Sequence, residues 1–108
     1  MPNEKDLQIA KEIKKELKKK LGNKLVSVIL YGSRARGTAK KDSDMDLFLL
    51  TKRKIKSFGK DDDLIIDLET DYQFEKNLDV QIFNQGVSEF KKNKERLFYR
   101  EVAKGVRL

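Results

Sequence analysis

A small mixed β-sheet backed by helices, an α/β (α+β) fold, is predicted by three features of this 108-residue sequence. Apolar residues recur at helical spacing near both ends of the chain, and three short apolar segments between them are typical of strands. The length gives room for one modest core. We therefore expect a single domain over residues 1–108, in the order helix, strand, short helix, strand, helix, strand, helix.

The first helix is expected from Glu4 to about Leu21, with Asn3 as its N-cap and Gly22 directly after its end. Apolar residues at three- and four-residue spacing form a narrow stripe: Leu7, Ala10, Ile13, Leu17 and Leu21. Lysines occupy the remaining faces, as on a solvated helix surface: Lys11, Lys14, Lys15, Lys18, Lys19 and Lys20.

Two apolar segments follow and predict two strands. Leu25 to Tyr31 is nearly uninterrupted in its apolar character, which is typical of a strand buried on both faces. A short helix or turn ending at Gly37 and a polar loop over residues 38–43 lead to the second strand, Asp44 to Thr51. Alternation places Met45, Leu47 and Leu49 on one face of that strand, and Asp44, Asp46, Phe48 and Leu50 on the other.

The next segment is a basic loop, Lys52 to Lys60, which is either a solvated connector or a segment that closes over a ligand. Asp61, Asp62 and Asp63 then precede a helical pattern that should end near Asn77. Capping of this helix is favoured over a metal role for the three carboxylates.

The last part of the chain predicts a third strand over residues 78–83 and a second amphipathic helix over residues 88–103. Gly105 should end that helix, and residues 106–108 have the character of a short strand. The apolar positions expected in the helix are Phe90, Leu97, Phe98 and Val102.

The most informative stretch runs from Tyr31 to Leu50 and reads YGSRARGTAKKDSDMDLFLL. Asp44 and Asp46 are two residues apart on a strand, so both carboxylates project from one face with Cα atoms roughly 6 to 7 Å apart. Two converging carboxylates repel each other unless a cation lies between them. Mg²⁺ is the natural occupant, because it is a hard divalent ion that prefers oxygen ligands.

The residues before these carboxylates suit a phosphate. Gly32 permits close backbone approach or a positive φ, and Ser33 offers a hydroxyl and an N–H at the start of a helix, where anions are favoured. Arg34 and Arg36 supply charge for phosphate oxygens. A lone G-S turn or a lone D-x-D pair is usually structural, but the two in this order and spacing predict a nucleotide site.

A third carboxylate, Asp79, alternates with apolar residues in the predicted third strand. An acidic residue in a buried-looking strand is costly without a partner, and a metal shared with Asp44 and Asp46 would provide one. The alternative is an edge strand with Asp79 facing water.

The segments G-S-R-A-R-G and S-D-M-D-L resemble the signature of the DNA polymerase beta-type nucleotidyltransferases, and the minimal nucleotidyltransferase (MNT) branch most closely. The resemblance covers nearly the whole chain and implies the polymerase beta-like fold. It implies that Asp44, Asp46 and Asp79 are the catalytic, metal-binding carboxylates, with two Mg²⁺ ions expected. Gly32 and Ser33 would bind the β- and γ-phosphates of ATP, and Arg36 is a weaker candidate for leaving-group charge.

The activity that this resemblance implies is transfer of AMP from ATP to a hydroxyl, with release of pyrophosphate. Minimal members are typically encoded beside a helical HEPN partner, which suggests an antitoxin that adenylylates a tyrosine of that toxin. Two alternatives stay open: a noncatalytic antitoxin that neutralises its partner by complex formation, and a nucleic-acid-tailing nucleotidyltransferase.

Composition excludes several other classes. The chain has no cysteine and no histidine, which removes disulfides, a Ser-His-Asp triad and the usual zinc sites. The net charge of +7 suits a polyanion, but the charges are spread along the chain, so nucleic acid is not the expected partner. With no apolar signal region and no membrane-length apolar run, we expect a cytoplasmic protein that uses no membrane; oligomerisation stays open.

Overall fold

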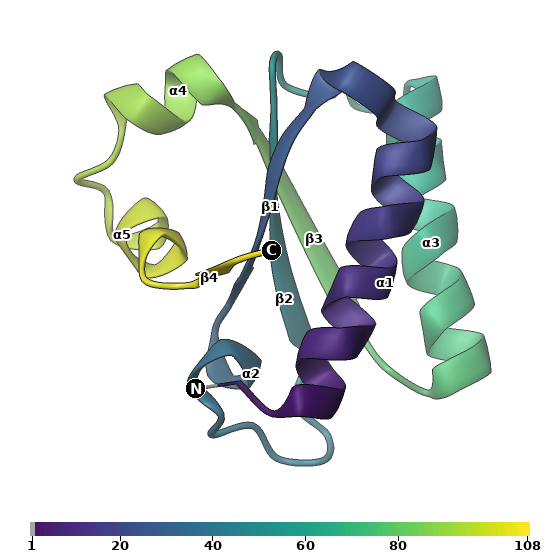
Figure 1. The fold of residues 1–108 in the computed structure, drawn as a ribbon. Helices are drawn as coiled ribbons and strands as arrows, with labels where there is room; N and C mark the ends of the chain where they lie inside the picture. Colours follow the sequence, from purple (N-terminus) through teal and green to yellow (C-terminus); the bar gives the residue numbers. More distant parts are fainter. Residues whose placement is uncertain (1) are drawn as a thin grey trace.

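The computed structural model describes residues 2–108 as a four-stranded mixed sheet with helices on both faces (Figure 1). The strands are β1 (Leu25–Tyr31), β2 (Met45–Thr51), β3 (Val80–Gly86) and β4 (Val106–Arg107). The α-helices are α1 (Glu4–Leu21), α2 (Ser33–Arg36), α3 (Lys60–Lys76), α4 (Val87–Lys92) and α5 (Leu97–Ala103), and a short 3₁₀ turn, η1 (Gly22–Lys24), joins α1 to β1.

The sheet has the strand order β3-β2-β1-β4. β1 pairs antiparallel with β2 and with β4, whereas β2 pairs parallel with β3 through the crossover helix α3. The predicted mixed sheet backed by helices is therefore confirmed. Within residues 2–108, no helix combines the length and the apolar character needed to cross a membrane.

Each face of the sheet has its own apolar core. On one face α1 and α3 cover a larger core that includes Ile13, Val28 and Leu47. On the other face α4 and α5 cover a smaller core built around Phe48 and Val102. The predicted alternation of β2 is confirmed, because its odd-numbered residues from Met45 to Leu49 join the first core, whereas Phe48 and Leu50 join the second.

The first helix has the predicted bounds. The Asn3 carboxamide oxygen accepts the backbone N–H of Lys5 at 2.8 Å, and this bond supplies the N-cap. At the other end Gly22 has φ 58°, a left-handed value that an L-residue adopts only with strain. Leu17 and Leu21 of the predicted apolar stripe are buried.

The acidic run lies in the first turn of α3, where its charges complement the helix dipole as predicted, but the N-cap is Gly59, which has no side chain to cap the helix. The Asp62 carboxylate accepts the backbone N–H of Phe58 at 2.9 Å, and the Asp61 carboxylate pairs with Lys24 at 2.9 Å. Asn77 ends the helix in the left-handed region with φ 51°.

The last third of the chain differs from the prediction in two places. The single helix expected over residues 88–103 is wrong: α4 ends at Lys92 and α5 begins at Leu97. Leu97, expected to be apolar and packed, is 80% exposed. The third strand begins later than predicted, at Val80. It also ends later, because Asn84 and Gln85, which look like turn residues, continue β3 as far as Gly86.

Candidate active site

The predicted site residues meet at one end of the sheet, where β1 ends and both β2 and β3 begin. Gly32 and Ser33 follow β1 directly, and Tyr31 lies opposite Asp46 in the antiparallel register. The backbone N–H of Met45 donates to the backbone carbonyl of Asp79 at 2.9 Å, so the segments carrying all three carboxylates are adjacent. The topology thus brings the G-S turn, the D-x-D pair and the third carboxylate together.

The three carboxylates lie in different environments. Asp46 is half-buried on the face of β2 that also carries Phe48, whereas Asp44 and Asp79 are exposed. Of the two alternatives for Asp79, the edge strand is correct: Asp79 is exposed and directly precedes β3, which is an edge strand. The Asp79 carboxylate accepts a hydrogen bond from the Gln81 side-chain amide at 2.9 Å.

Uncompensated negative charge gathers at Asp46. Burial raises the pKa of the Asp46 carboxyl, the carboxylates of Asp44 and Asp79 raise it further, and the Arg36 guanidinium opposes this rise. Burial, followed by the charge of Asp46, raises the pKa of the neighbouring Tyr31 hydroxyl. A cation bound between these carboxylates would relieve their mutual repulsion.

The chemistry of this donor set fits a hard divalent cation, because the candidate ligands are three carboxylates without a nitrogen or sulfur donor. As the side chains stand, no three acidic residues in the described part of the chain are close enough to hold one ion together. Asp44 and Asp79 also line a cavity of about 870 Å³ between the sheet end, the start of α1 and the end of α3. Shared coordination would thus require the exposed pair to turn towards Asp46.

Gly32 fits closely against Asp46. Its φ is 77° and a Cβ placed on it would lie 2.5 Å from the Asp46 carboxylate oxygen Oδ2. A side chain at this position would therefore displace the half-buried carboxylate. Ser33 then begins α2, a single four-residue turn that ends at Gly37 in the left-handed region.

The two arginines of the motif play different parts. The Arg34 side chain is largely buried, where Nη1 donates to Asp6 at 2.7 Å and Nη2 donates to the Ser43 backbone carbonyl at 2.7 Å. Its guanidinium is thus committed to the fold and is not free for phosphate, contrary to the expectation. Arg36 is more than half exposed, with its nearest carboxylate, Glu101, at 3.9 Å. Only Arg36 keeps an available charge beside Asp46.

An aromatic wall lies beside the carboxylates and was missed by the sequence reasoning. Phe98 of α5 packs edge-on against Tyr31 and Phe83, with ring centroids 5.8 Å and 5.6 Å apart. Phe98 is 42% exposed and Phe83 49%, so neither ring is fully covered. Such rings can stack on nucleobases. The aromatic residues were visible in the sequence, but their meeting depends on how α5 folds back.

The basic loop does not cover this site. β2 carries the carboxylates at its start and the loop at its end, and these are separated by the seven residues of the strand. The loop instead meets the far end of β3, where the backbone N–H of Ile55 donates to the side chain of Asn84 at 2.7 Å. Of the two interpretations left open, the connector is correct.

The chain belongs to the nucleotidyltransferase domain family, whose model matches residues 10–105. The fold is also that of solved structures. A chain of a toxin-antitoxin crystallised with AMP-PNP matches with a TM-score of 0.62 at 20% identity, and the match covers 91% of this chain and 70% of that one. The resemblance drawn from the sequence is thereby confirmed.

Two mutants of the toxin-antitoxin MntA-HpeT give similar matches. Their TM-scores are 0.63 and 0.60, their identities 17% and 18%, and both matches cover 91% of this chain and 70% of the other. No curated protein matches the chain in sequence.

Proposed function

We propose that this protein transfers AMP from ATP to a hydroxyl of a partner protein and acts as the antitoxin of a toxin–antitoxin pair. The observation that carries the proposal is the meeting of the Gly32-Ser33 turn with Asp44, Asp46 and Asp79 at one sheet end, in a chain of the nucleotidyltransferase domain family. The structural match to a toxin-antitoxin crystallised with AMP-PNP supports both the donor and the biological role.

Each group of site residues has a separate role in the proposed reaction. Asp44, Asp46 and Asp79 would hold Mg²⁺, which supplies neutralising charge for the triphosphate and for the leaving group. Gly32 and Ser33 would contact the β- and γ-phosphates, and Arg36 would add positive charge beside Asp46. The partly exposed rings of Phe83 and Phe98 would offer a place for the adenine ring to stack.

The reaction is an in-line displacement at the α-phosphorus. The acceptor oxygen forms a bond to phosphorus, the bond to the bridging oxygen breaks, and pyrophosphate leaves. Asp79 would accept the proton of the attacking hydroxyl, since its carboxylate is exposed to an approaching acceptor. On the proposed reading the acceptor is a tyrosine of a HEPN-type helical toxin.

Intact-mass analysis tests this directly. The protein encoded beside this chain is incubated with the chain, ATP and Mg²⁺, and a parallel sample contains the variant Asp44→Asn/Asp46→Asn. We expect added mass in whole AMP units that is absent from the variant sample. A stable complex without added mass would instead favour a noncatalytic antitoxin, and nucleotide incorporation into an added oligonucleotide would favour a tailing enzyme.

A further inference from the structure

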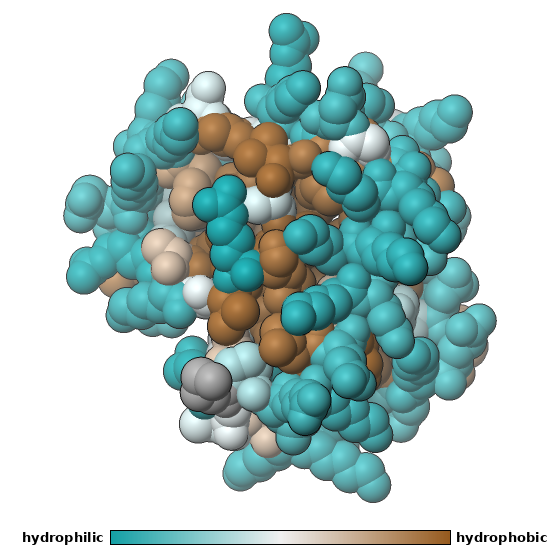
Figure 2. Space-filling view, in the orientation of Figure 1, coloured by the Kyte–Doolittle hydropathy of each residue, from teal (hydrophilic) through white to brown (hydrophobic). Residues whose placement is uncertain are grey.

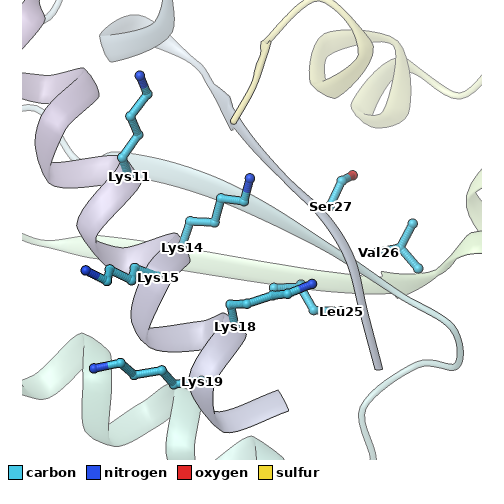
Figure 3. Close-up of a pocket in the computed structure, with 8 residues that line it drawn as sticks. All are labelled: Lys11, Lys14, Lys15, Lys18, Lys19, Leu25, Val26 and Ser27. Carbon is cyan, nitrogen blue, oxygen red and sulfur yellow. The ribbon is translucent and has the colours of Figure 1, made fainter. Parts of the chain in front are cut away.

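A groove of about 500 Å³ lies between α1 and the first half of β1, away from the candidate active site (Figure 3). Its walls are formed by Leu25, Val26 and Ser27 of β1 and by five lysines of α1: Lys11, Lys14, Lys15, Lys18 and Lys19. Figure 2 shows the same arrangement on the surface, where an apolar band along the middle of the molecule is bordered by hydrophilic side chains on the side of α1.

The strand edge in this groove is unpaired. β4 pairs only with Ile29 and Leu30 of β1, and the last hydrogen bond along this edge joins the Leu108 N–H to the Val28 carbonyl at 2.9 Å. Over residues 25–27, β1 has a neighbouring strand only on the β2 side. Val26 lies in an irregularity of the β1–β2 register and is 43% exposed. An open edge of this kind is a template for another strand.

The lysines beside the edge are largely without partners. Lys14 donates to the backbone carbonyl of Leu108 at 2.7 Å. The other four lysines make no ion pair with any residue from 2 to 108. Like charges four residues apart on a helix repel each other, as in the pairs Lys11 and Lys15, and Lys15 and Lys19. The groove therefore combines an open backbone edge with concentrated positive charge.

We propose that this groove binds an extended acidic segment of a partner protein, which adds a strand to the free edge of β1. Alternate residues of a strand repeat about every 6.6 Å, and Lys11 and Lys15 are separated by about 6 Å along the helix axis. Two carboxylates two residues apart in the segment thus fit against the lysines of α1. The inference rests on the edge and its charge, and does not depend on nucleotide transfer.

Other occupants fit these observations less well. A second copy of the chain would bring two lysine-lined edges together, which the like charges oppose. A nucleic acid would satisfy the lysines but not the backbone groups that point out of the open edge of β1. Lysines at a strand edge also prevent self-association of the protein. If that were their only role here, the groove would bind no ligand.

Fluorescence anisotropy with two labelled peptides tests the proposal on the full chain. One peptide alternates glutamate with valine and threonine, and the other has glutamine at every glutamate position. We expect the glutamate peptide to bind at least about tenfold more tightly, and the variant Lys15→Glu/Lys18→Glu to lose that preference. The matched control, Lys91→Glu/Lys94→Glu, changes the same charge on the other side of the sheet and should bind within about twofold of wild type.

Amide exchange supplies a second readout that also holds if the lysine variant is destabilised. Bound peptide should slow exchange at Val26 and its neighbours in wild-type protein, and circular dichroism checks the fold of each variant. Three results would overturn the proposal: equal affinity for both peptides, a single-stranded oligonucleotide that binds the lysines without slowing edge exchange, or a concentration-dependent dimer that protects the edge without peptide.

Discussion

Gly32 and Asp46 depend on each other. The glycine has the positive φ that the turn after β1 needs, and the space where its side chain would lie is filled by the Asp46 carboxylate. The glycine at position 32 therefore sets the position of the Asp46 carboxylate on the neighbouring strand. The D-x-D spacing alone predicts the face of the strand from which Asp46 projects. It does not predict that the backbone of Gly32, 14 positions earlier, holds the carboxylate in place.

We expect Gly32→Ala to destabilise the protein by about 1 to 2 kcal/mol through its positive φ, and to abolish the proposed AMP transfer by displacing Asp46. Chemical denaturation and the intact-mass assay measure the two effects.

Gly22→Ala is the matched control, because Gly22 also has a positive φ but a Cβ there meets no atom within 4 Å. It should show a similar loss of stability with transfer retained. Equal loss of transfer in both variants would mean that backbone strain, and not the contact with Asp46, disables the site.

At the scale of single elements, the structure agrees best with the sequence where periodicity and a glycine coincide. α1 and β1 have their predicted bounds because each has a regular apolar pattern and α1 meets Gly22 at its end. The sequence left open whether Asp79 belongs to a buried strand or to an edge strand, because this depends on the order of the strands in the sheet. That is a property of topology, and β3 proves to be an edge.

The break between α4 and α5 has a geometric cause. Phe90 and Tyr99 are nine residues apart, so a continuous helix of about 100° per residue would point them in opposite directions. Both instead pack against Phe48, with ring centroids 5.4 Å and 5.9 Å from its ring. The segment between them contains no glycine or proline. The local signal is a single asparagine, Asn93, which is the C-cap of α4 and whose side-chain amide donates to the Glu89 backbone carbonyl at 2.8 Å; packing on the sheet sets the direction of α5 beyond it.

Truncation within α5 tests which of its residues the packing uses. Val102 is fully buried in the smaller core, so Val102→Ala should cost about 2 kcal/mol of the free energy of unfolding. Leu97→Ala, at an exposed position, should change it by less than about 0.5 kcal/mol. Urea unfolding of both variants gives the comparison, and the reverse order would support the single predicted helix.

The outer edge of β3 is protected by α3, and this makes stability depend on pH. The Glu69 carboxylate accepts the backbone N–H of Ile82 at 2.9 Å, and burial raises the pKa of the Glu69 carboxyl despite this bond. A carboxyl whose pKa is higher folded than unfolded costs stability as pH rises from its ordinary range, near 4.3, through the raised value.

Glu69→Gln should therefore give a small rise in Tm at pH 7, because the amide oxygen can still accept the Ile82 N–H without a buried charge. The gain should shrink as pH falls below the ordinary glutamate pKa. Thermal melts at pH 7 and at pH 4 measure this gain. If the variant is less stable than wild type at pH 7, the charge of Glu69 strengthens its hydrogen bond to Ile82 by more than the cost of burying that charge.

At the scale of the whole molecule, one side chain links three parts of the chain. Arg34 of α2 binds Asp6 near the start of α1 and the backbone carbonyl of Ser43, the residue before Asp44. It thus fixes the loop that delivers the D-x-D pair. The sequence suggested that Arg34 binds phosphate, because an arginine directly after a G-S turn gives no sign of a partner 28 positions earlier.

Arg34→Ala should destabilise the protein by about 2 to 3 kcal/mol, since it leaves a largely buried Asp6 carboxylate without its partner. Arg36→Ala removes an exposed charge of the same motif and should cost less than about 0.5 kcal/mol. Urea unfolding of both variants at one salt concentration makes the comparison. Equal costs would argue against a structural role for Arg34.

The position of the loop between β2 and α3 has a practical consequence. Because it lies at the far end of the sheet, its length can change without moving the carboxylates, and evolution could extend it independently of the chemistry. The same separation makes Phe58, which is 94% exposed, a convenient point to attach a fluorophore or a fusion partner. A reporter placed there would follow binding of the proposed partner while leaving the three carboxylates undisturbed.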